Sequence, residues 1–435
     1  MASRRPEHTV AACAFSRYSA PRARPVRRVA PVPFALFAAP RLSENAFRMV
    51  EAAAGLPEVR LGVVTQDEAS ALRHLAGRVA HWRVADVLDV DQLAWAAQGL
   101  ARAHGPPDRL FGAFEQLQVP LAEARERLGI AGMSVEVAHN FRDKARMKAR
   151  LRAAGLPCAR HALVHDVAAA EAFAEAAGLP VVVKPPAGAG AVATTRVDTM
   201  DALRAAVRQA SPSAAAPVLL EEFVLGEEHS FETVTVAGEH RWHSLTHYAP
   251  TPLEVLANPW IQWTLVLPRE VDAPAYDDIR GVARRALDVL GMDTGLSHLE
   301  WFRRRDGSVA ISEVAARPPG AQITQLMSYA HDVDVLREWA RAMILGDFHA
   351  PARRYAAGAA FLRGQGRGRV VAVHGIDVVN REFGDLLVAA HTPAPGTAPS
   401  TSYEGEGWVI VRHPETAVVA RAVRRLVEVL RVELG

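Results

Sequence analysis

One stretch of the sequence, GLSHLEWFRRRDGSVAISEVAARPPG at residues 295–320, constrains the fold more than any other. Asp306-Gly307 separates two runs in which apolar and polar residues alternate, and this is a strong signal for a β-hairpin. Side chains alternate along a strand, so a turn centred on that dipeptide sets which residues face each other. The pairs predicted on one face are Glu300 with Glu313, His298 with Ala315, and Phe302 with Ile311.

The two opposed carboxylates need a physical reason, because like charges directly opposite each other destabilise a ladder. A bound cation, a shared proton, or a solvent-facing position would each supply one. Phe302 and Ile311 on the same face favour partial burial, and Mg²⁺ prefers carboxylate oxygens together with phosphates and water. We therefore predict Glu300 and Glu313 as magnesium ligands. Arg317 follows on the same face by alternation, and its planar set of donors could hold a phosphoryl group.

The chain has 435 residues, which is too long for one ordinary core and predicts several domains. Half of the residues are apolar and 23% are charged, which is the composition of a globular protein. The formal net charge of +2 gives no overall reason to expect nucleic acid. Cys13 and Cys158 are too few for a disulfide framework or a cysteine-built metal site.

Residues 1–31 are strongly biased, because they are rich in arginine and contain a single acidic residue, Glu7. We expect a disordered basic tail, with a transit-like leader or a binding arm for nucleic acid or membrane as the alternatives. No apolar run approaches the roughly 20 residues that a membrane span needs. The expected location is therefore the cytoplasm.

The rest of the chain is predicted to form three units. Residues 32–140 alternate strand and helix signals, including a helix from about Ser43, and predict an α/β domain. Residues 141–350 predict a second domain, in which a compact module over about 159–218 could move as a lid. Residues 351–435 predict a distinct C-terminal α+β unit that ends in an amphipathic helix from about Thr416.

Two further motifs in the second unit are weak by themselves. In LPVVVKPPAGAGAVATTRV, Lys184 ends an apolar strand before a loop of small residues, where backbone N–H groups could approach phosphates. The stretch lacks the spacing of a P-loop or a dinucleotide fold, so a simple hairpin connection is the better interpretation in isolation. In VLLEEFVLGEEHSFE, a buried strand runs into acids that could bind ribose, or that could simply lie at the surface.

Taken in order over residues 143–346, these features resemble the ATP-grasp superfamily. Its pattern has a lysine in a D-K helix, a strand-ending lysine before a Gly-rich loop, an E-E-x-[VI]-x-G-x-E segment, and two metal carboxylates followed by an arginine. The resemblance implies a mixed α/β and α+β fold with an N-terminal α/β domain, a mobile lid, a central antiparallel sheet and a small C-terminal unit. It also implies ATP and Mg²⁺ as cofactors, and Mn²⁺ could substitute.

The resemblance assigns roles residue by residue. The matches are Lys144 and Lys184 to the phosphate-binding lysines, Gly188 and Gly190 to the loop over the phosphates, Glu221, Glu222, Phe223 and Val224 to the adenine hinge, Glu228 to the ribose carboxylate, Glu300 and Glu313 to the magnesium ligands, and Arg317 to the arginine that acts with Lys184 in phosphoryl transfer.

The chain departs from the family at one of these motifs. The usual E-x-N-x-R supplies an asparagine as a third metal ligand, whereas this chain has Ala315 there, and alanine cannot coordinate a metal. The same loss is common in the branch that resembles bacterial L-amino-acid ligases and carnosine synthase, where E-x-x-A-R-x-x-G occurs. The HGID turn at 374–377 and the Gly-rich C-terminal unit are also similar to the closing domain of that branch.

The resemblance implies a ligase that joins a small carboxylate to an amine through an acyl phosphate, with amino acids as the first expectation for substrates. Trp260 and Trp263, in the segment at 249–265, either line an apolar substrate pocket or belong to the core. His298 either orients a substrate carboxylate or phosphate, or supports a metal ligand.

Three alternatives stay open at this point. Bicarbonate activation or ligation of a nucleotide precursor would keep every nucleotide-binding residue and change only the substrate pocket. A non-catalytic ATP-binding regulator gains some support from Ala315 but is opposed by the lysines, glutamates and arginine that remain. The third alternative is a binder of nucleic acid or membrane that acts through the arginine-rich tail at 1–31, although neither is the expected partner of the folded part. The oligomeric state is open, a homodimer included.

Overall fold

The computed structural model describes residues 32–187, 194–258 and 260–435. The predicted tail at 1–31 lies outside these ranges, and so do Gly188 and Gly190 of the predicted phosphate loop. None of the helices in the described ranges is long and apolar enough to cross a membrane.

The N-terminal part is built on a parallel sheet with the strand order β3-β2-β1-β4. Its central strand β1 is entirely apolar and buried, as expected for a parallel strand that is covered on both faces. Ser43 caps α1, so the predicted start of this helix is confirmed, and Gly129 ends α3 in the left-handed conformation. The elements are β1 Phe34–Ala39, α1 Glu44–Ala54, β2 Arg60–Thr65, β3 Val79–Arg83, α2 Val90–His104, β4 Arg109–Phe111, η2 Glu115–Leu117, α3 Gln118–Leu128 and α4 Val135–Arg142.

The predicted lid module is an antiparallel sheet, order β5-β8-β6-β7, with two helices. Its buried apolar residues form a cluster of their own, drawn only from this module. This separate core is consistent with a unit that could move as one body. The elements are α5 Lys144–Ala153, which precedes the module, and β5 His161–Val164, α6 Val167–Ala177, β6 Val181–Lys184, β7 Thr195–Val197, α7 Met200–Ala210 and β8 Val218–Glu222.

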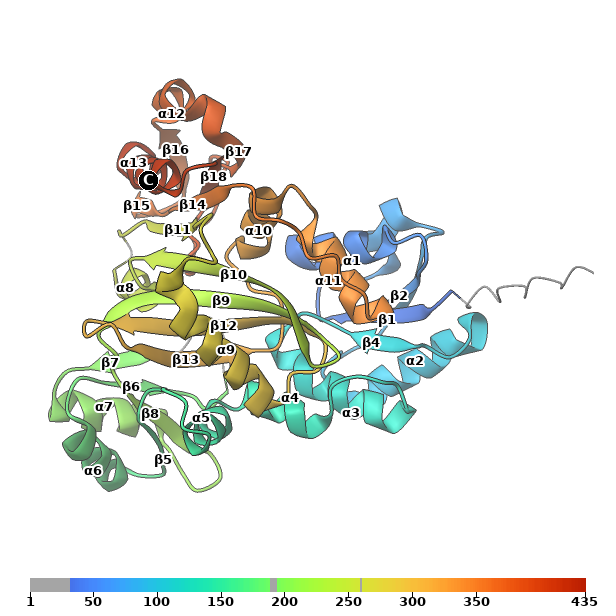
Figure 1. Cartoon of the computed structure of the whole chain (residues 1–435), viewed down its shortest axis with the longest axis horizontal. Coiled ribbons are helices and arrows are strands. Elements are labelled where there is room, and N and C mark those ends of the chain that lie inside the picture. The colour runs from blue at the N-terminus through green and yellow to red at the C-terminus, as the bar shows by residue number, and fades with distance from the viewer. Residues whose placement is uncertain (1–31, 188–193, 259) are drawn as a thin grey trace, which may run out of the picture. The chain divides into compact units, whose positions relative to one another are not determined.

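The middle of the molecule is an eight-stranded antiparallel sheet with the order β13-β12-β9-β10-β11-β14-β18-β17 (Figure 1). The Asp306-Gly307 turn joins β12 to β13 as predicted, with Gly307 at φ 82°. The strands are β9 Gly226–Val236, β10 Glu239–Ala249, β11 Trp263–Leu267, β12 Gly295–Arg304, β13 Val309–Ala315, β14 Ala356–Leu362, β17 Leu387–His391 and β18 Gly407–His413, and the helices are α8 Pro252–Ala257, α9 Asp277–Leu290, α10 Ile323–His331 and α11 Val335–Leu345.

The C-terminal region is less separate than the sequence suggested. Strands β14, β17 and β18 extend the central sheet beyond β11, so this sheet crosses the boundary predicted at residue 350. A smaller sheet, with the order β15-β19-β16, belongs to the C-terminal region alone. Its elements, with the helices beside them, are β15 Gly364–Gly366, β16 Val370–His374, α12 Ile376–Phe383, α13 Thr416–Val429 and β19 Arg431–Leu434.

The hairpin register is as predicted at its open end and differs near the turn. Glu300 lies opposite Glu313, and His298 lies opposite Ala315. The ladder then shifts, because Ile311 pairs with Trp301 and leaves Ser312 as an extra residue in β13. A bulge of this kind inserts one residue into one strand. The predicted pair of Phe302 with Ile311 is therefore wrong, and Ile311 packs with Trp301 in the core on the other face.

The C-terminal helix α13 packs closely on the sheet at Gly358 of β14. A Cβ atom there would lie 2.7 Å from side-chain atoms of Val419 and Val423. Gly281, inside α9, has open space around the corresponding position. The two glycines therefore form a matched pair for testing whether this contact is tight.

We predict that Gly358→Ala lowers the free energy of unfolding by about 1–3 kcal/mol, because the extra methyl forces α13 away from the sheet. Gly281→Ala should raise it by about 0.5–1 kcal/mol, because alanine is the better helix former. Urea unfolding of both variants measures the difference. Equal effects of the two substitutions would show that α13 is loosely packed.

Candidate active site

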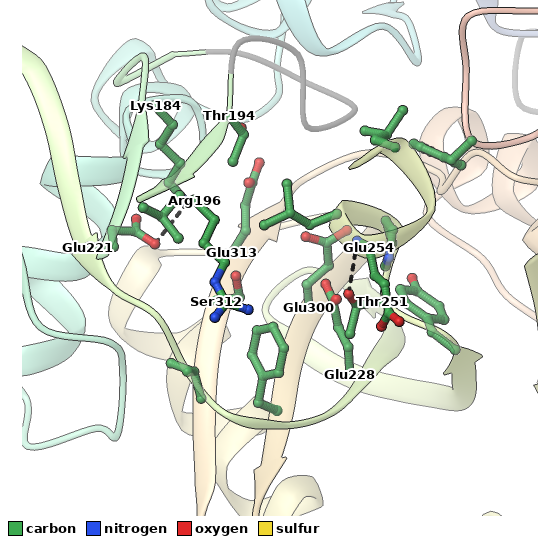
Figure 2. Close-up of a pocket in the computed structure, with 18 of the residues that line it drawn as sticks. Lys184, Thr194, Arg196, Glu221, Glu228, Thr251, Glu254, Glu300, Ser312 and Glu313 are labelled. Atoms are coloured by element: carbon green, nitrogen blue, oxygen red, sulfur yellow. Dashed lines mark hydrogen bonds and ion pairs between the residues drawn. The ribbon is translucent and has the colours of Figure 1, made fainter. Parts of the chain in front are cut away.

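A cavity of about 1120 Å³ lies where the lid module meets the central sheet, and it contains most of the predicted site residues. The lid contributes Lys184 and the segment 221–225, while the sheet contributes Glu228, Glu300 and Glu313. Figure 2 shows these side chains in one close-up, with Lys184 beside Glu221. Among the predicted site residues, Trp260 lies elsewhere on the surface, with 65% of its area exposed.

The sheet face of the cavity is acidic. Alternation along β9 places Glu228 on the same face as Ser230 and Glu232, and Glu228 pairs with Phe302 of β12. Burial, and then the charge of Glu300, raise the pKa of Glu228 well above its ordinary value. A cluster of this kind is stable in its charged form only if cations lie close to it.

Two lysines from different elements supply positive charge. Lys144 is the first residue of α5, and its Nζ lies 2.5 Å from Oε1 of Glu313. Lys184 ends β6, and its Nζ lies 2.9 Å from Oε2 of Glu221. Burial opposes the charged amine of Lys184, but Glu221 and Glu313 outweigh it and raise its pKa above the ordinary value.

The carboxylate of Glu313 is held in its charged form. Burial opposes this charge, but Lys144, Lys184 and Arg317 outweigh it and lower the pKa of Glu313 to about 2. Its partner Glu300 keeps 30% of its side chain exposed, and the corresponding figure for Glu313 is 21%. Both carboxylates are thus partly accessible from the cavity that they line.

A third lysine, Lys148, lies beneath the cavity. It is fully buried in α5, where its Nζ donates to the carbonyl of Ser312 at 2.7 Å and lies 3.3 Å from Glu221. Burial lowers the pKa of Lys148, although Glu221 acts in the opposite direction. Burial also opposes the charge of Glu221, but Lys148 and Lys184 outweigh it and lower the pKa of Glu221.

The predicted adenine hinge runs from Glu221 to Val224, directly where β8 ends. The N–H groups of Glu222 and Phe223 donate to the carbonyls of Arg160 and Pro180. The N–H of Val224 donates to no described residue, and Val224 is among the residues that line the cavity. The hinge assignment remains a prediction.

The carboxylate of Glu222 is engaged by two guanidinium groups. Arg160 Nε lies 2.5 Å from one of its oxygens, and Arg304 Nη2 lies 2.9 Å from the other. This hinge residue is therefore held at the edge of the cavity by its neighbours in the structure.

Arg317 lines the same cavity, and its main partner, Glu115, lies outside the central sheet. Its Nε donates to Oε2 of Glu115 at 2.7 Å, and its Nη1 donates to the carbonyl of Pro318 at 2.9 Å. Burial opposes its charge, but Glu115 outweighs burial and raises the pKa of Arg317 above its ordinary value. The guanidinium is therefore charged and fixed in orientation.

His298 connects the cavity to a buried acid. Its Nδ1 lies 2.9 Å from Oε1 of Glu232, which is fully buried and also accepts a hydrogen bond from Ser230 at 2.5 Å. Its Nε2 lies 3.5 Å from Glu300. Burial opposes the charged ring, but Glu232 and Glu300 outweigh it and raise the pKa of His298 to about 9.

Part of the cavity lining is aromatic. Trp263 is buried in the core, yet it also lines the cavity together with Tyr248 and Tyr403. Its ring lies 4.9 Å from that of Tyr403 and 5.4 Å from that of Tyr248. The two interpretations of Trp263 from the sequence are therefore compatible in this structure.

Sequence reasoning missed several residues that shape this site. Lys148 lies in the helix that follows the D-K pair, and Glu232 ends the VLLEEFVLGEEHSFE stretch, but neither was assigned a role, while Glu115 and Tyr403 reach the site from distant segments without a motif. The alternation along β9 could have placed Glu232 on the face of Glu228. No local signal in the sequence singles out Glu115 or Tyr403.

The residues present fit a nucleotide with a divalent cation. Mg²⁺ in phosphoryl-transfer sites is held by one or two carboxylates together with phosphates and water, and Glu300 and Glu313 offer that number. Among the described residues, no three or more His, Cys, Asp or Glu side chains gather as a metal-binding group. The amines of Lys144 and Lys184 form ion pairs with carboxylates in this structure. A phosphate oxygen could take the place of either carboxylate oxygen.

Comparison with known proteins identifies this region. The sequence pattern of the ATP-grasp domain matches residues 149–324, which contain the hinge, both predicted metal ligands and Arg317. Residues 149–324 form an ATP-grasp domain. The resemblance and the fold class predicted from the sequence are therefore confirmed, and ATP-grasp domains as a family bind ATP with Mg²⁺.

The relatives of this chain include amino-acid ligases. It is 24% identical over 252 residues to the L-arginine-specific L-amino acid ligase of Bacillus subtilis, an alignment that covers 57% of this chain and 59% of that one. It is 27% identical over 237 residues to an alanine–anticapsin ligase of Bacillus subtilis, covering 50% and 49%. The chain thus spans only about half of the length of these relatives.

A solved structure extends the likeness to nearly the whole chain. The L-amino acid ligase from Bacillus licheniformis superposes with a TM-score of 0.73 at 18% identity, covering 93% of this chain and 99% of that one. At this identity, the likeness concerns the fold of the ATP-grasp protein.

The raised pKa of His298 generates a prediction about stability. A group whose pKa is raised by folding, here from about 6.5 to about 9, contributes stability that is complete below its ordinary pKa. That stability, at most about 3 kcal/mol, is lost as the pH rises through about 9. His298→Gln cannot titrate, so its free energy of unfolding should change less between pH 6.5 and 9.5.

Urea unfolding at the two pH values measures this difference. His240→Gln is the matched control, because His240 also lies on the central sheet and pairs with a carboxylate, Asp288, at 3.0 Å. The same pH dependence in His298→Gln and wild type would show that His298 is not held as an imidazolium.

Proposed function

We propose that this protein is an ATP-dependent carboxylate–amine ligase that forms an amide bond through an acyl phosphate. The proposal depends on the residues that line one cavity. Two lysines, a fixed arginine and two opposed glutamates line it together with the predicted hinge segment. Phosphoryl transfer needs charge neutralisation and in-line geometry more than it needs an acid or a base. The cavity supplies that kind of chemistry.

The proposed reaction has two steps. The carboxylate of the first substrate attacks the γ-phosphorus of ATP, the bond to the β,γ-bridging oxygen breaks, and ADP leaves. The amine of the second substrate then attacks the acyl carbon, the bond to the phosphate oxygen breaks, and inorganic phosphate leaves with an amide as product. The amine loses a proton to the medium in this second step.

Each part of the cavity has a role in the proposal. Lys144 and Lys184 bind the phosphates, the hinge at Glu221–Val224 binds adenine, and Glu228 binds ribose. Glu300 and Glu313 hold Mg²⁺, which neutralises phosphate charge when bound. Arg317 stabilises the phosphoryl group in transfer, and closure of the lid excludes water, which would otherwise hydrolyse the acyl phosphate.

For substrates, we infer amino acids or related small carboxylates and amines. The activities of the related amino-acid ligases support this class, and the aromatic residues of the cavity, Trp263, Tyr248 and Tyr403, suit a substrate that carries an apolar group. ATP as a substrate is consistent with a cytoplasmic location.

The alternatives from the sequence make different predictions. Bicarbonate activation would make phosphate release depend on bicarbonate and on no organic carboxylate. A non-catalytic regulator would bind ATP and be stabilised by it, yet release no phosphate with any acceptor.

The first test is phosphate release from ATP and Mg²⁺ across a panel of amino acids, alone and in pairs. We expect particular carboxylate and amine pairs to stimulate release, with mass spectrometry identifying the amide. Glu313→Gln should lower the stimulated rate by about 100-fold or more, because it removes a predicted metal ligand.

The matched control for this test is Glu239→Gln, which changes an exposed glutamate of the same sheet that pairs with Arg241. It should leave the rate unchanged. If no pair stimulates release from the wild type while ATP still raises its melting temperature, the ligase proposal is wrong and the regulator is favoured.

A second test addresses the lid. Closure of the module at about 159–218 over a bound nucleotide should slow its proteolysis several-fold in the presence of a non-hydrolysable ATP analogue and Mg²⁺. Limited proteolysis with mapping of the cut sites measures this, and cuts in the N-terminal sheet serve as the internal control. Equal cleavage of the module with and without nucleotide would argue against a mobile lid.

A further inference from the structure

Glu115 is a buried carboxylate that belongs to the N-terminal part of the chain and lies outside the region that matches the ATP-grasp pattern. It opens the short helix η2, a few residues after β4 ends, and only 6% of the residue is exposed. A buried carboxylate is costly unless it is paired and hydrogen-bonded. The carboxylate of Glu115 therefore needs a cationic partner.

The carboxylate of Glu115 lies between two guanidinium groups. Its Oε2 accepts a hydrogen bond from Nε of Arg317 at 2.7 Å, while its Oε1 lies 3.9 Å from Nη1 of Arg142. Arg317 is also tied at Nη1 by the carbonyl of Pro318. Two points of attachment fix the plane of a guanidinium, and its other Nη protons remain for a ligand in the cavity that Arg317 lines.

Glu313 carries the opposite charge and lines the same cavity as Arg317. The charge of Glu313 acts on Arg317, and the charge of Arg317 in turn acts on Glu313. Without another acceptor, the attraction between these two groups would draw the guanidinium toward a predicted metal ligand. Arg317 would then neutralise the carboxylate that has to hold the cation, and its donors would turn away from the phosphoryl group.

We propose that Glu115 is a positioning residue, which holds Arg317 by its Nε so that the remaining donors face the transferring phosphoryl group and Glu313 stays available to the metal. This inference rests on the proposed function, in which Arg317 stabilises phosphoryl transfer. It makes the N-terminal part of the chain a contributor to the catalytic centre.

The first experiment is a double-mutant cycle with Glu115→Gln and Arg317→Lys. Glutamine is close in size but lacks the charge that holds the guanidinium, so kcat should fall by at least about tenfold, as expected for a misplaced catalytic group. The KM for ATP should change by less than about twofold, because the lysines and the hinge are untouched. Arg317→Lys keeps the charge but loses the Nε donor.

The cycle distinguishes positioning from general structural support. If Glu115 acts through Arg317, adding Glu115→Gln to Arg317→Lys should lower kcat no further. Effects that multiply in the double variant would overturn the proposal. Glu115→Asp keeps the charge on a shorter side chain and should lie between wild type and Glu115→Gln, and it serves in the cycle if Glu115→Gln does not fold.

A second readout does not depend on the ligase substrates. Calorimetry of ADP binding with Mg²⁺, with and without fluoroaluminate, measures how well the site holds a mimic of the phosphoryl group in transfer. Fluoroaluminate should tighten ADP binding to the wild type, and Glu115→Gln should lose at least about tenfold of that gain while its affinity for ADP alone is kept. Glu126→Gln, a change in the same part of the chain, should behave as wild type.

The outcomes separate the two proposals. If no substrate pair stimulates phosphate release but the fluoroaluminate gain depends on Glu115, the proposed function fails and the positioning role stands. If the wild type turns over normally and Glu115→Gln keeps both kcat and the fluoroaluminate gain, the positioning role fails alone. A wild type without either activity or fluoroaluminate gain would overturn both.

Discussion

The structure depends on the balance of charge around two carboxylates that face each other across β12 and β13. Glu300 and Glu313 are directly opposed and only partly exposed, and such a pair of like charges is unstable unless cations approach it. The cations come from separate elements: Lys144 from the start of α5, Lys184 from the end of β6, and Arg317 from the segment after β13. The elements that meet at the cavity are thus the ones that deliver positive charge to this pair.

Lys148 is a further buried cation, which links strand β13 to the predicted hinge. It bonds to the carbonyl of Ser312, the extra residue of the bulge in β13, and it lies beside Glu221 at the start of the hinge. Glu221 in turn holds Lys184. One buried side chain of α5 therefore contacts both the strand that carries Glu313 and the strand that leads into the hinge.

Local sequence signals predicted much of this arrangement. The Asp306-Gly307 turn and strand alternation placed Glu300 opposite Glu313, and cap residues such as Ser43 marked helix ends. The pairing of Phe302 with Ile311 failed because a bulge depends on the packing of Trp301 and Ile311 against the core, which alternation does not encode. The continuation of the central sheet into β14 and β18 was missed for a similar reason, since strand pairing over a long separation leaves no local pattern.

The roles of the site residues remain predictions, but the geometry shows why the matched ATP-grasp region alone is an incomplete description of this cavity. The region that matches the ATP-grasp pattern contains Arg317, whereas the carboxylate that orients Arg317 belongs to a segment about 200 residues earlier. An arginine has several donors and a flexible chain, so its charge alone does not define where it points. Its orientation is defined only when another part of the fold takes up Nε. In this chain that part is η2, which follows the edge strand β4 of the N-terminal sheet, and this contact gives a physical reason for the N-terminal α/β part to pack against the central sheet.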